Sequence, residues 1–486
     1  MEILFILGIT VILALGAVFI NNGRALGIVN FLGHLVIAAF SLRIVSFVIA
    51  AKQAVSLFNF FYIDALSGIF ILTISVLNIA ASLYSIDYMN KDLTEGVITA
   101  KKFKTYYILF NLFAFSMFFV TVVDNLGMIW VAIEATTLTS AFLVGFHNNK
   151  SSVEAAWKYI IICSVGITLA LFGTILFYYT ASAQGGIRSL NWTEMVLVAS
   201  KLDPRIIKTA FLFILVGYGT KAGIVPMHTW LPDAHSQALS PISALLSGVL
   251  LKTAIYAILR FTVIVNKCVG ASYAGNLLIF FGLLSLVVSA GFILVQKDLK
   301  RLLAYSSIEH IGIICVGLGI GGAIGFYGAL LHVFNHAVTK SAMFFGAGNI
   351  VKKYKTNNMN MIRGVIKTLP FTGIVVIIAT FALAGSPPFS IFISEIIILV
   401  SAFTKGAYIT AAILLLSIAV IFAGIIHHIS RMVFGRRPEN MALSHESAGG
   451  KTAFLFLLVF ICALGFRIPH LLNGLLVSAV EILKGV

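Results

Sequence analysis

Six charged side chains stand inside long apolar runs of this 486-residue sequence. They are Glu134, Lys221, Lys252, Glu309, Lys340 and Glu395. Lys252 is the clearest case, because SALLSGVLLKTAIYAILRF surrounds it with apolar residues and offers no neighbouring acid. A basic residue at the centre of a membrane span costs roughly 2.5–3.5 kcal/mol even on the lenient insertion scale. These residues therefore indicate a hydrated interior or a partner carboxylate. The structural alternatives are backbone carbonyls in a broken helix for Lys252 and pairing with helix-end lysines for the glutamates.

The segment HVFNHAVTKSAMFF places His332, His336 and Lys340 at positions i, i+4 and i+8. On a helix these three side chains share one face, with a rise of about 6 Å per step. Imidazole can hand on a proton between its two nitrogens, so this buried row predicts a hydrated proton wire. The alternative for a His-x3-His pair is zinc, but the sequence shows no third ligand for it.

Three of the nine prolines interrupt apolar runs. Pro226 follows Lys221 in GTKAGIVPMHTWLPDAHSQALSP. Pro387 and Pro388 stand in FALAGSPPFSIFISE, ahead of Glu395. Proline removes a hydrogen bond of the helical ladder, and in a membrane the freed groups need protein or water as partners. The sequence therefore predicts two broken helices that carry titratable groups.

The polar residues after the first break have two interpretations. His228, Asp233 and His235 either line an access path or cap the next helix near the surface. Lys158 lies four residues after Glu154, a spacing that an ordinary surface ion pair explains as well as a functional role does.

Charged residues near the ends of the apolar runs are weaker indicators of function than those at the centres. Arg43, Arg260 and Arg467 lie close to helix ends, where we expect long side chains to reach the lipid headgroups. Asp64 and Asp124 also lie at span ends, and we expect structural roles for both.

Composition identifies an integral membrane protein. The chain is 60% hydrophobic and 10% charged, with a mean hydropathy of +1.05, whereas soluble domains carry roughly a quarter charged residues. Apolar runs of about 20 residues favour helices over the ten-residue alternating strands of a barrel. Four scattered cysteines indicate neither a disulfide nor a metal site. The net charge of +16 lies mostly in short loops, so we expect no nucleic-acid partner.

The apolar runs predict an all-α fold, a single polytopic membrane domain over residues 1–486 with about fourteen spans. Their limits are 2–20, 27–50, 62–86, 106–123, 126–146, 156–181, 206–225, 237–264, 273–295, 302–319, 322–350, 369–402, 407–433 and 452–474.

The basic residues of the loops predict an orientation. Eighteen of the 33 Lys and Arg lie in loops after odd-numbered spans. On the opposite side lie eight: Lys52, Arg188, Lys201, Arg205, Lys208, Lys267, Lys405 and Lys484. This bias puts the odd loops in the cytoplasm and both termini on the outer side.

Charges and breaks recur five helices apart. Helix five carries Glu134, and helix seven breaks beside Lys221. Helix ten carries Glu309, and helix twelve breaks ahead of Glu395. An odd shift inverts the topology of the second unit. The placement therefore predicts two inverted five-helix repeats, helices 4–8 (residues 106–264) and helices 9–13 (residues 273–433), each with a half-channel.

Four motifs resemble the antiporter-like membrane subunits of respiratory complex I: KAGIVPMHTWLPDAH, SPISALLSGVLLKTAIYAILRF, KDLKRLLAYSSIEHIG and HVFNHAVTKSAMFFGAG. The same module occurs in multi-subunit cation/proton antiporters and in membrane-bound hydrogenases. The resemblance runs from FYIDALSGIF to ALAGSPPFSIFISE, which is most of the chain. Within this superfamily, WVAIEATTLTSAFLVGFHNNKSSVEAAWKYIIICSVG is most similar to component F of hydrogenase-4-type formate hydrogenlyases.

The resemblance implies roles in proton translocation. Glu134 would pair with Lys221, and Lys252 would be the central relay lysine. His332, His336 and Lys340 would carry protons toward the second half-channel, and Glu395 would be the exit-side carrier.

The resemblance also implies a setting in the cell (inner or cytoplasmic) membrane. Other membrane subunits and a peripheral redox arm would be the partners, with lipids around them. This chain would carry no cofactor and no redox catalytic site of its own. Iron–sulfur clusters and, in a hydrogenase, a nickel–iron site would belong to partner subunits.

The function expected is a proton-translocating subunit of a redox-driven membrane complex. One alternative is a subunit of a sodium/proton antiporter without redox partners. Sodium would need hard oxygen ligands, to which Glu309 or Glu395 could contribute. The other is a scaffold with an inactive channel that anchors redox subunits.

Overall fold

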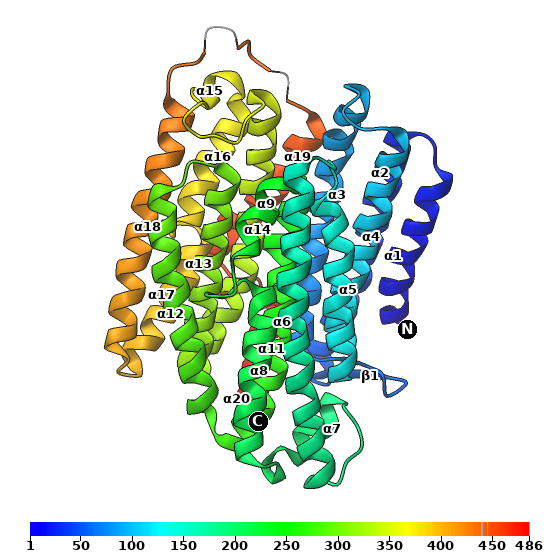
Figure 1. Ribbon diagram of the computed structural model, residues 1–486, viewed down its shortest axis with the longest axis vertical. Coiled ribbons are helices and arrows are strands. Elements are labelled where there is room, and N and C mark those ends of the chain that lie inside the picture. Colours follow the sequence, from blue (N-terminus) through cyan, green and yellow to red (C-terminus); the bar gives the residue numbers. More distant parts are fainter. Residues whose placement is uncertain (439–440, 445, 486) are drawn as a thin grey trace.

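The computed structural model describes residues 1–438, 441–444 and 446–485. Within them the chain is a bundle of long helices, and both termini lie toward the same end of it (Figure 1). The first part contains α1 (Glu2–Phe19), α2 (Gly23–Ala51), β1 (Val55–Leu57), β2 (Phe61–Ile63), α3 (Ala65–Thr94), α4 (Ala100–Val122), α5 (Leu126–Val144), α6 (Lys150–Ala183), α7 (Trp192–Val198) and the short 3₁₀ turn η1 (Ala199–Lys201).

The second part begins with the first broken helix. It contains α8 (Pro204–Ala222), α9 (Trp230–Gln237), α10 (Ser240–Leu245), the π-helical turn η2 (Leu246–Leu250), α11 (Leu251–Val269), α12 (Ala271–Val295), α13 (Leu299–Ile320), α14 (Gly322–Tyr354), α15 (Val365–Thr368), α16 (Pro370–Leu383), α17 (Ser390–Thr404), α18 (Tyr408–Phe434), α19 (Ala448–Phe466) and α20 (His470–Lys484). The two short strands form an antiparallel hairpin.

Eleven helices among the described residues are long and apolar enough to cross a membrane. The helices α16 and α17 are shorter but also apolar. These features confirm the all-α membrane architecture. The number of fourteen spans and the inverted repeats at 106–264 and 273–433 stay predictions.

Polar caps start three helices that carry candidate residues, α5, α6 and α13. The side chain of Asn125 accepts a hydrogen bond from the backbone N–H of Met128 at 3.1 Å, at the start of α5. Asn149 and Asp298 cap α6 and α13 in the same way. These oxygens satisfy backbone N–H groups that have no partner within the helix.

The first predicted break is confirmed between α8 and α9. Helix α8 ends at Ala222, and Gly223 has a φ of 77°, the left-handed conformation that ends a helix. The indole N–H of Trp230 donates to the carbonyl of Thr220 at 2.8 Å. The hydroxyl of Ser285 accepts from the N–H of Val225 at 3.0 Å. Protein groups therefore satisfy the backbone that the break frees, as a membrane interior requires.

The second predicted break is confirmed between Leu383 of α16 and Ser390 of α17. The side-chain amide of Asn335 donates to the carbonyl of Ser390 at 2.7 Å. Asn335 belongs to α14, between His332 and His336. The break therefore lies directly against the helix that carries the histidine row.

Several predicted helix limits are wrong; for example, the predicted helices 106–123 and 156–181 begin earlier, at Ala100 and Lys150. The predicted span 452–474 ends at Phe466, because the backbone is extended at Arg467 and Pro469 has no N–H with which to continue the ladder. A separate helix, α20, follows. The predicted helix 62–86 begins only at Ala65, because Asp64 caps it and residues 61–63 pair in the hairpin, and it continues to Thr94.

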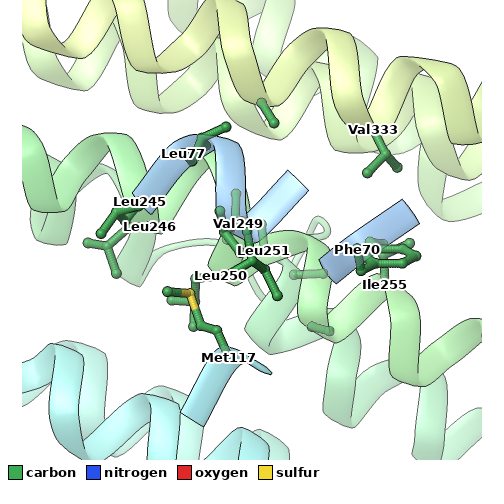
Figure 2. Close-up of a cluster of buried hydrophobic side chains, with 14 of the residues drawn as sticks. Phe70, Leu77, Met117, Leu245, Leu246, Val249, Leu250, Leu251, Ile255 and Val333 are labelled. Atoms are coloured by element: carbon green, nitrogen blue, oxygen red, sulfur yellow. The ribbon is translucent and has the colours of Figure 1, made fainter. Parts of the chain in front are cut away.

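The predicted helix 237–264 contains a π-helical turn, η2, that the apolar pattern did not indicate. Buried apolar side chains pack near this turn (Figure 2), among them Phe70 and Leu77 from α3, Met117 from α4 and Val333 from α14. A side chain on Gly248 would clash with Leu77. Glycine thus lets α3 approach the π turn, immediately before Lys252.

Candidate functional site

The first region of the site joins Glu134 of α5 to Lys221 of α8 through a hydroxyl group. The Thr137 hydroxyl donates to Glu134 Oε2 at 3.3 Å and accepts from Lys221 Nζ at 2.8 Å. The resemblance implied that the two charges pair. In the described residues the connection is this hydroxyl bridge, and the two charged groups form no direct ion pair.

Two residues of α6 complete this region. Lys221 Nζ also donates to the hydroxyl of Tyr159 at 2.5 Å. The hydroxyl of Ser164 donates to Glu134 Oε1 at 3.2 Å. Lys221, Thr137 and Tyr159 are buried, while Glu134 is partly exposed. Among the described residues, no buried nitrogen or oxygen of these five side chains lacks a hydrogen-bond partner. We call this set the hydroxyl-bridged region.

The second region begins at Lys252, which is fully buried in α11. Its ammonium group contacts the carbonyl of Ser247, which lies in the π turn, and Nδ1 of His336 at 2.6 Å. A π turn interrupts the regular i to i−4 ladder and often marks a functional site. Here a carbonyl of the turn solvates a cation that has no carboxylate within hydrogen-bond range.

Three histidines continue from Lys252. His310 Nδ1 and His332 Nε2 are 3.0 Å apart, and the rings of His310 and His336 have centroids 4.4 Å apart. His332 Nδ1 lies 3.0 Å from the hydroxyl of Ser394 of α17. All three rings are completely buried. We call His310, His332 and His336 the histidine cluster.

Four buried atoms around this cluster have no hydrogen-bond partner among the described residues. They are His310 Nε2, His336 Nε2, Lys340 Nζ and Glu309 Oε2. Most buried polar atoms in proteins do have a partner, so unpaired ones call for an explanation. Lys340 is buried on the helix predicted to carry it. Its ammonium group makes no hydrogen bond among the described residues, so it does not extend the row of contacts made by His332 and His336.

Glu395 lies at the far end of the cluster. Its side chain is buried, and its carboxylate packs against Gly385 in the second break. His310, His332 and Glu395 each offer one ligand atom, and these three atoms lie within 4.8 Å of one another. This set includes His332 but not His336, so it supplies no third ligand for the His-x3-His pair that the zinc alternative required. However, His310 and His332 meet at hydrogen-bond distance, so this arrangement fits a shared proton rather than two lone pairs aimed at one ion.

The residues after the first break divide into two groups. His235 is completely buried, stacks on Phe344 at 4.9 Å, and has no hydrogen-bond partner at either ring nitrogen. His228 is 8% exposed and lies beside the ring of Tyr305. Neither ring contacts the histidine cluster directly among the described hydrogen bonds and ring pairs.

Asp233 and Lys158 belong to a surface network of ion pairs. Lys158 contacts Glu154 at 2.7 Å and Asp233 at 3.1 Å. Arg301 contacts Asp233 at 2.6 Å. The side chain of Lys158 is 48% exposed. The surface pair between Lys158 and Glu154 expected from their spacing is present, and it extends to α9 and α13.

Arg260 corrects an expectation. We expected Arg43, Arg260 and Arg467 to extend toward lipid headgroups, but the Arg260 side chain is only 2% exposed. Its guanidinium group donates to both oxygens of Asp64, at 2.6 and 2.8 Å. Burial of the planar cation is possible because Asp64 offers a bidentate partner. Asp64 thus caps α3 and holds a buried ion pair, whereas Arg43 is exposed and pairs with Glu2 at 3.1 Å.

The sequence missed five polar residues of the site: Thr137, Tyr159, Ser164, His310 and Ser394. Two had a local signal. Thr137 stands one helical turn after Glu134, and His310 directly follows Glu309 in an otherwise apolar helix. Tyr159, Ser164 and Ser394 had none, because their neighbours in the site lie on other helices.

Comparisons with known proteins agree with this architecture. The family described as NADH:quinone oxidoreductase/Mrp antiporter, TM, matches residues 123–434, which include every residue of both regions. A hydrogenase-4 component F homolog from Methylacidiphilum infernorum (isolate V4) is 38% identical over 413 residues, or 85% of this chain and 86% of that protein.

Solved structures share the fold. A chain of the membrane-bound sulfane sulfur reductase, an archaeal respiratory membrane complex, superposes with a TM-score of 0.84 at 23% identity, covering 99% of this chain and 98% of that one. A chain of the Mrp complex from Dietzia sp. DQ12-45-1b gives a TM-score of 0.85 at 20% identity, with the same coverage of both chains.

Proposed function

The chain belongs to the NADH:quinone oxidoreductase/Mrp antiporter family of membrane subunits, and on this basis we propose that it translocates protons within a redox-driven membrane complex. It is a multi-pass membrane protein whose structural neighbours are parts of multi-subunit membrane complexes. One observation carries the proposal: a buried series of contacts runs from Lys252 through His336 and His310 to His332.

The histidine cluster can move protons by short steps. The ammonium group of Lys252 faces His336 Nδ1, so a proton can pass between these atoms. His310 and His332 share a hydrogen bond, and His332 contacts the hydroxyl of Ser394 on the helix that carries Glu395. A neutral imidazole that accepts a proton on one nitrogen can release one from the other. The unpaired nitrogens of His310 and His336 leave both rings free to accept a proton.

The hydroxyl-bridged region can regulate the uptake and release of a proton by Lys221. A nearby carboxylate favours the protonated form of an amine. Because Thr137 links Glu134 to Lys221, a rotation of its hydroxyl or a movement of Glu134 weakens that influence and favours proton release. In this mechanism the chain makes and breaks no bond other than those to protons.

The setting is proposed from the relative at 38% identity, which is a hydrogenase-4 component F homolog. A peripheral redox arm would drive the translocation, with iron–sulfur clusters and a nickel–iron site in partner subunits. The complex would lie in the cell membrane, with both termini of this chain on the outer side, and residues 106–264 and 273–433 would form two inverted half-channels.

The test is proton uptake by the purified complex in sodium-free proteoliposomes, followed with a pH-sensitive dye. The complex is isolated through a tag on this chain, and its nickel and iron are measured beside the identity of the copurified subunits. Redox-driven acidification without sodium is expected. A strict requirement for sodium, with no redox subunit copurified, would establish the antiporter alternative instead.

Glu134→Gln distinguishes translocation from a purely structural role. This change keeps the shape of the side chain and its contact with Ser164 but removes the charge. We expect the complex to assemble and to catalyse its redox reaction with less proton uptake per turnover. Unchanged uptake in this variant and in Lys252→Ala, with assembly intact, would favour the scaffold alternative.

A further inference from the structure

A cavity of about 610 Å³ opens at the end of the bundle where both termini lie. Its walls come from the junction of α11 with α12, the junction of α13 with α14, the loop after α17 and the end of α20. Three lysines line it: Lys267, Lys405 and Lys484. We call it the three-lysine cavity.

This end of the molecule has fewer basic residues than the opposite end, but three of its lysines gather at one cavity. The sequence assigns eight basic residues to the side opposite the odd-numbered loops, and these three are among them. Its described lining contains no Asp or Glu. Lys484 pairs with Glu481 at 2.8 Å, outside the lining, whereas Lys267 and Lys405 form no ion pair within the described residues. The cavity therefore has an excess of positive charge.

Two helix N-termini add to this charge. Helix α12 begins at Ala271 and α14 at Gly322, and both residues line the cavity. Glycines precede both helices, so neither has a side-chain cap, unlike α13 with its Asp298. The first N–H groups of each helix carry partial positive charge and have no helical partner. Such termini bind phosphate groups in many proteins.

Lys405 provides a second, independent sign of an anion. Its Nζ lies 3.2 Å from the point that a Cβ on Gly322 would occupy. An anion placed between this ammonium group and the positive end of α14 would interact favourably with both. The buried Oδ1 of Asn266, also in the lining, has no hydrogen-bond partner. A ligand with both a phosphate and a hydroxyl group would satisfy both features.

The rest of the lining combines polar and apolar side chains. Leu278, Leu318, Phe326 and Leu483 are buried side chains of its lining. Ile279 of the lining is partly exposed, and its neighbour Phe280 is 60% exposed on α12. The acyl chains of a lipid would cover this apolar face, whereas a free phosphate would leave it uncovered. The cavity also lies where α12 and α14 begin, at the level expected for headgroups.

We propose that the three-lysine cavity binds the headgroup of an anionic phospholipid of the phosphatidylglycerol type. The phosphate lies between Lys267, Lys405 and the N-termini of α12 and α14. A headgroup hydroxyl donates to Asn266, and the acyl chains leave along the exposed face of α12. A bound lipid would hold the start of α14, the helix that carries His332 and His336, without taking part in proton transfer.

The test measures retained lipid and thermal stability of the intact complex. Wild type, Lys267→Gln with Lys405→Gln, and the control Lys52→Gln with Lys208→Gln are purified and analysed by native mass spectrometry. Lys52 and Lys208 belong to the same end of the molecule but do not line the cavity. Each lysine near an anionic headgroup contributes about 1 kcal/mol, and the cavity variant removes two, so we expect retained phosphatidylglycerol to fall roughly thirtyfold in that variant only.

Added probes identify the ligand. Delipidated wild type is titrated with dioleoyl-phosphatidylglycerol, dioleoyl-phosphatidylcholine or glycerol 3-phosphate, and the melting temperature is recorded. The proposal is supported if only phosphatidylglycerol raises the melting temperature. This effect should be lost in the cavity variant and restored by Lys267→Arg with Lys405→Arg. Equal stabilisation by glycerol 3-phosphate would assign a small-anion site instead. Loss of a partner subunit from the cavity variant at unchanged lipid content would show that a protein carboxylate occupies the cavity, and equal lipid loss in both variants would refute a specific site.

Discussion

The hydroxyl-bridged region and the histidine cluster solve the problem of buried charge in different ways. In the first, hydroxyl groups surround Lys221 and Glu134, and no buried polar atom of the five side chains is left without a partner. In the second, Lys252 relies on a π-turn carbonyl and an imidazole, and four nearby atoms have no partner.

This difference indicates that the hydroxyl-bridged region holds a charge in place, whereas the histidine cluster can transfer a proton. A fully hydrogen-bonded group resists change, because any rearrangement breaks a satisfied bond. An imidazole with an unpaired nitrogen can accept a proton without first losing a bond. We therefore expect changes in the cluster to affect proton transfer itself, and changes in the first region to affect its coupling to the redox reaction.

The largest effect is expected from Lys252→Ala. Both contacts of the ammonium group disappear, and proton uptake in proteoliposomes should fall about 10³-fold, at the middle of the range for groups that transfer protons directly. Thr262→Val is the matched control on α11, because its hydroxyl bonds only to the carbonyl of Ile258. Normal uptake by Lys252→Ala would show that protons bypass this lysine.

His310→Gln should reduce uptake about 10²-fold, because the hydrogen bond to His332 is kept in shape but no longer relays a proton. His34→Gln is the control, since His34 is an equally buried histidine that bonds to Asn111 on the other side of the bundle. If both variants lose activity alike, the effect is one of burial and the cluster is not a relay.

Thr137→Val tests the hydroxyl bridge while both charges remain. Loss of a hydrogen bond to a charged group should lower the proton uptake per redox turnover about tenfold. Thr136→Val is the control, because that neighbouring hydroxyl bonds to the carbonyl of its own helix at Ile133. Residues of one hydrogen-bond network have non-additive effects when both are changed. If the double variant of Thr137→Val and Glu134→Gln shows the simple sum of the two single effects, the hydroxyl bridge is contradicted.

The smallest effect concerns Asp124, in the loop before α5. Burial raises the pKa of this carboxyl group, and hydrogen bonds from Thr193 only partly oppose it. When the pKa of a carboxyl group is higher in the folded than in the unfolded protein, its contribution to the stability is fully present at a pH below the pKa of the unfolded chain. This contribution is lost as the pH rises through the pKa of the folded protein. Asp124→Asn should therefore gain melting temperature relative to wild type between pH 4 and 8, roughly the range above the ordinary aspartate value. Asp203→Asn, at the cap of α8, is the control, and an equal gain there would rule out this explanation.

Local sequence was sufficient for the helices and for most of the charged residues of the site. Apolar runs, prolines and capping residues act within a few positions of the chain, so both broken helices and the buried charges could be predicted. Resemblance to a family added the roles of Glu134 and Lys221, but not the Thr137 hydroxyl between them. Arg260 shows the limit most clearly: its place near a helix end predicted exposure, yet Asp64, far away in the sequence, holds it in the interior.

The sequence by itself determined that this chain is an α-helical membrane protein with lysines, glutamates and histidines buried in its spans, because the free energy of transfer to lipid depends on composition and local pattern. Only the tertiary structure decided which of those groups meet. His310 joins His332 from another helix, a π turn orients a carbonyl toward Lys252, and Lys158 remains at the surface with Asp233. Hydrogen bonds act over about 3 Å, so contacts between helices depend on packing that no local pattern records.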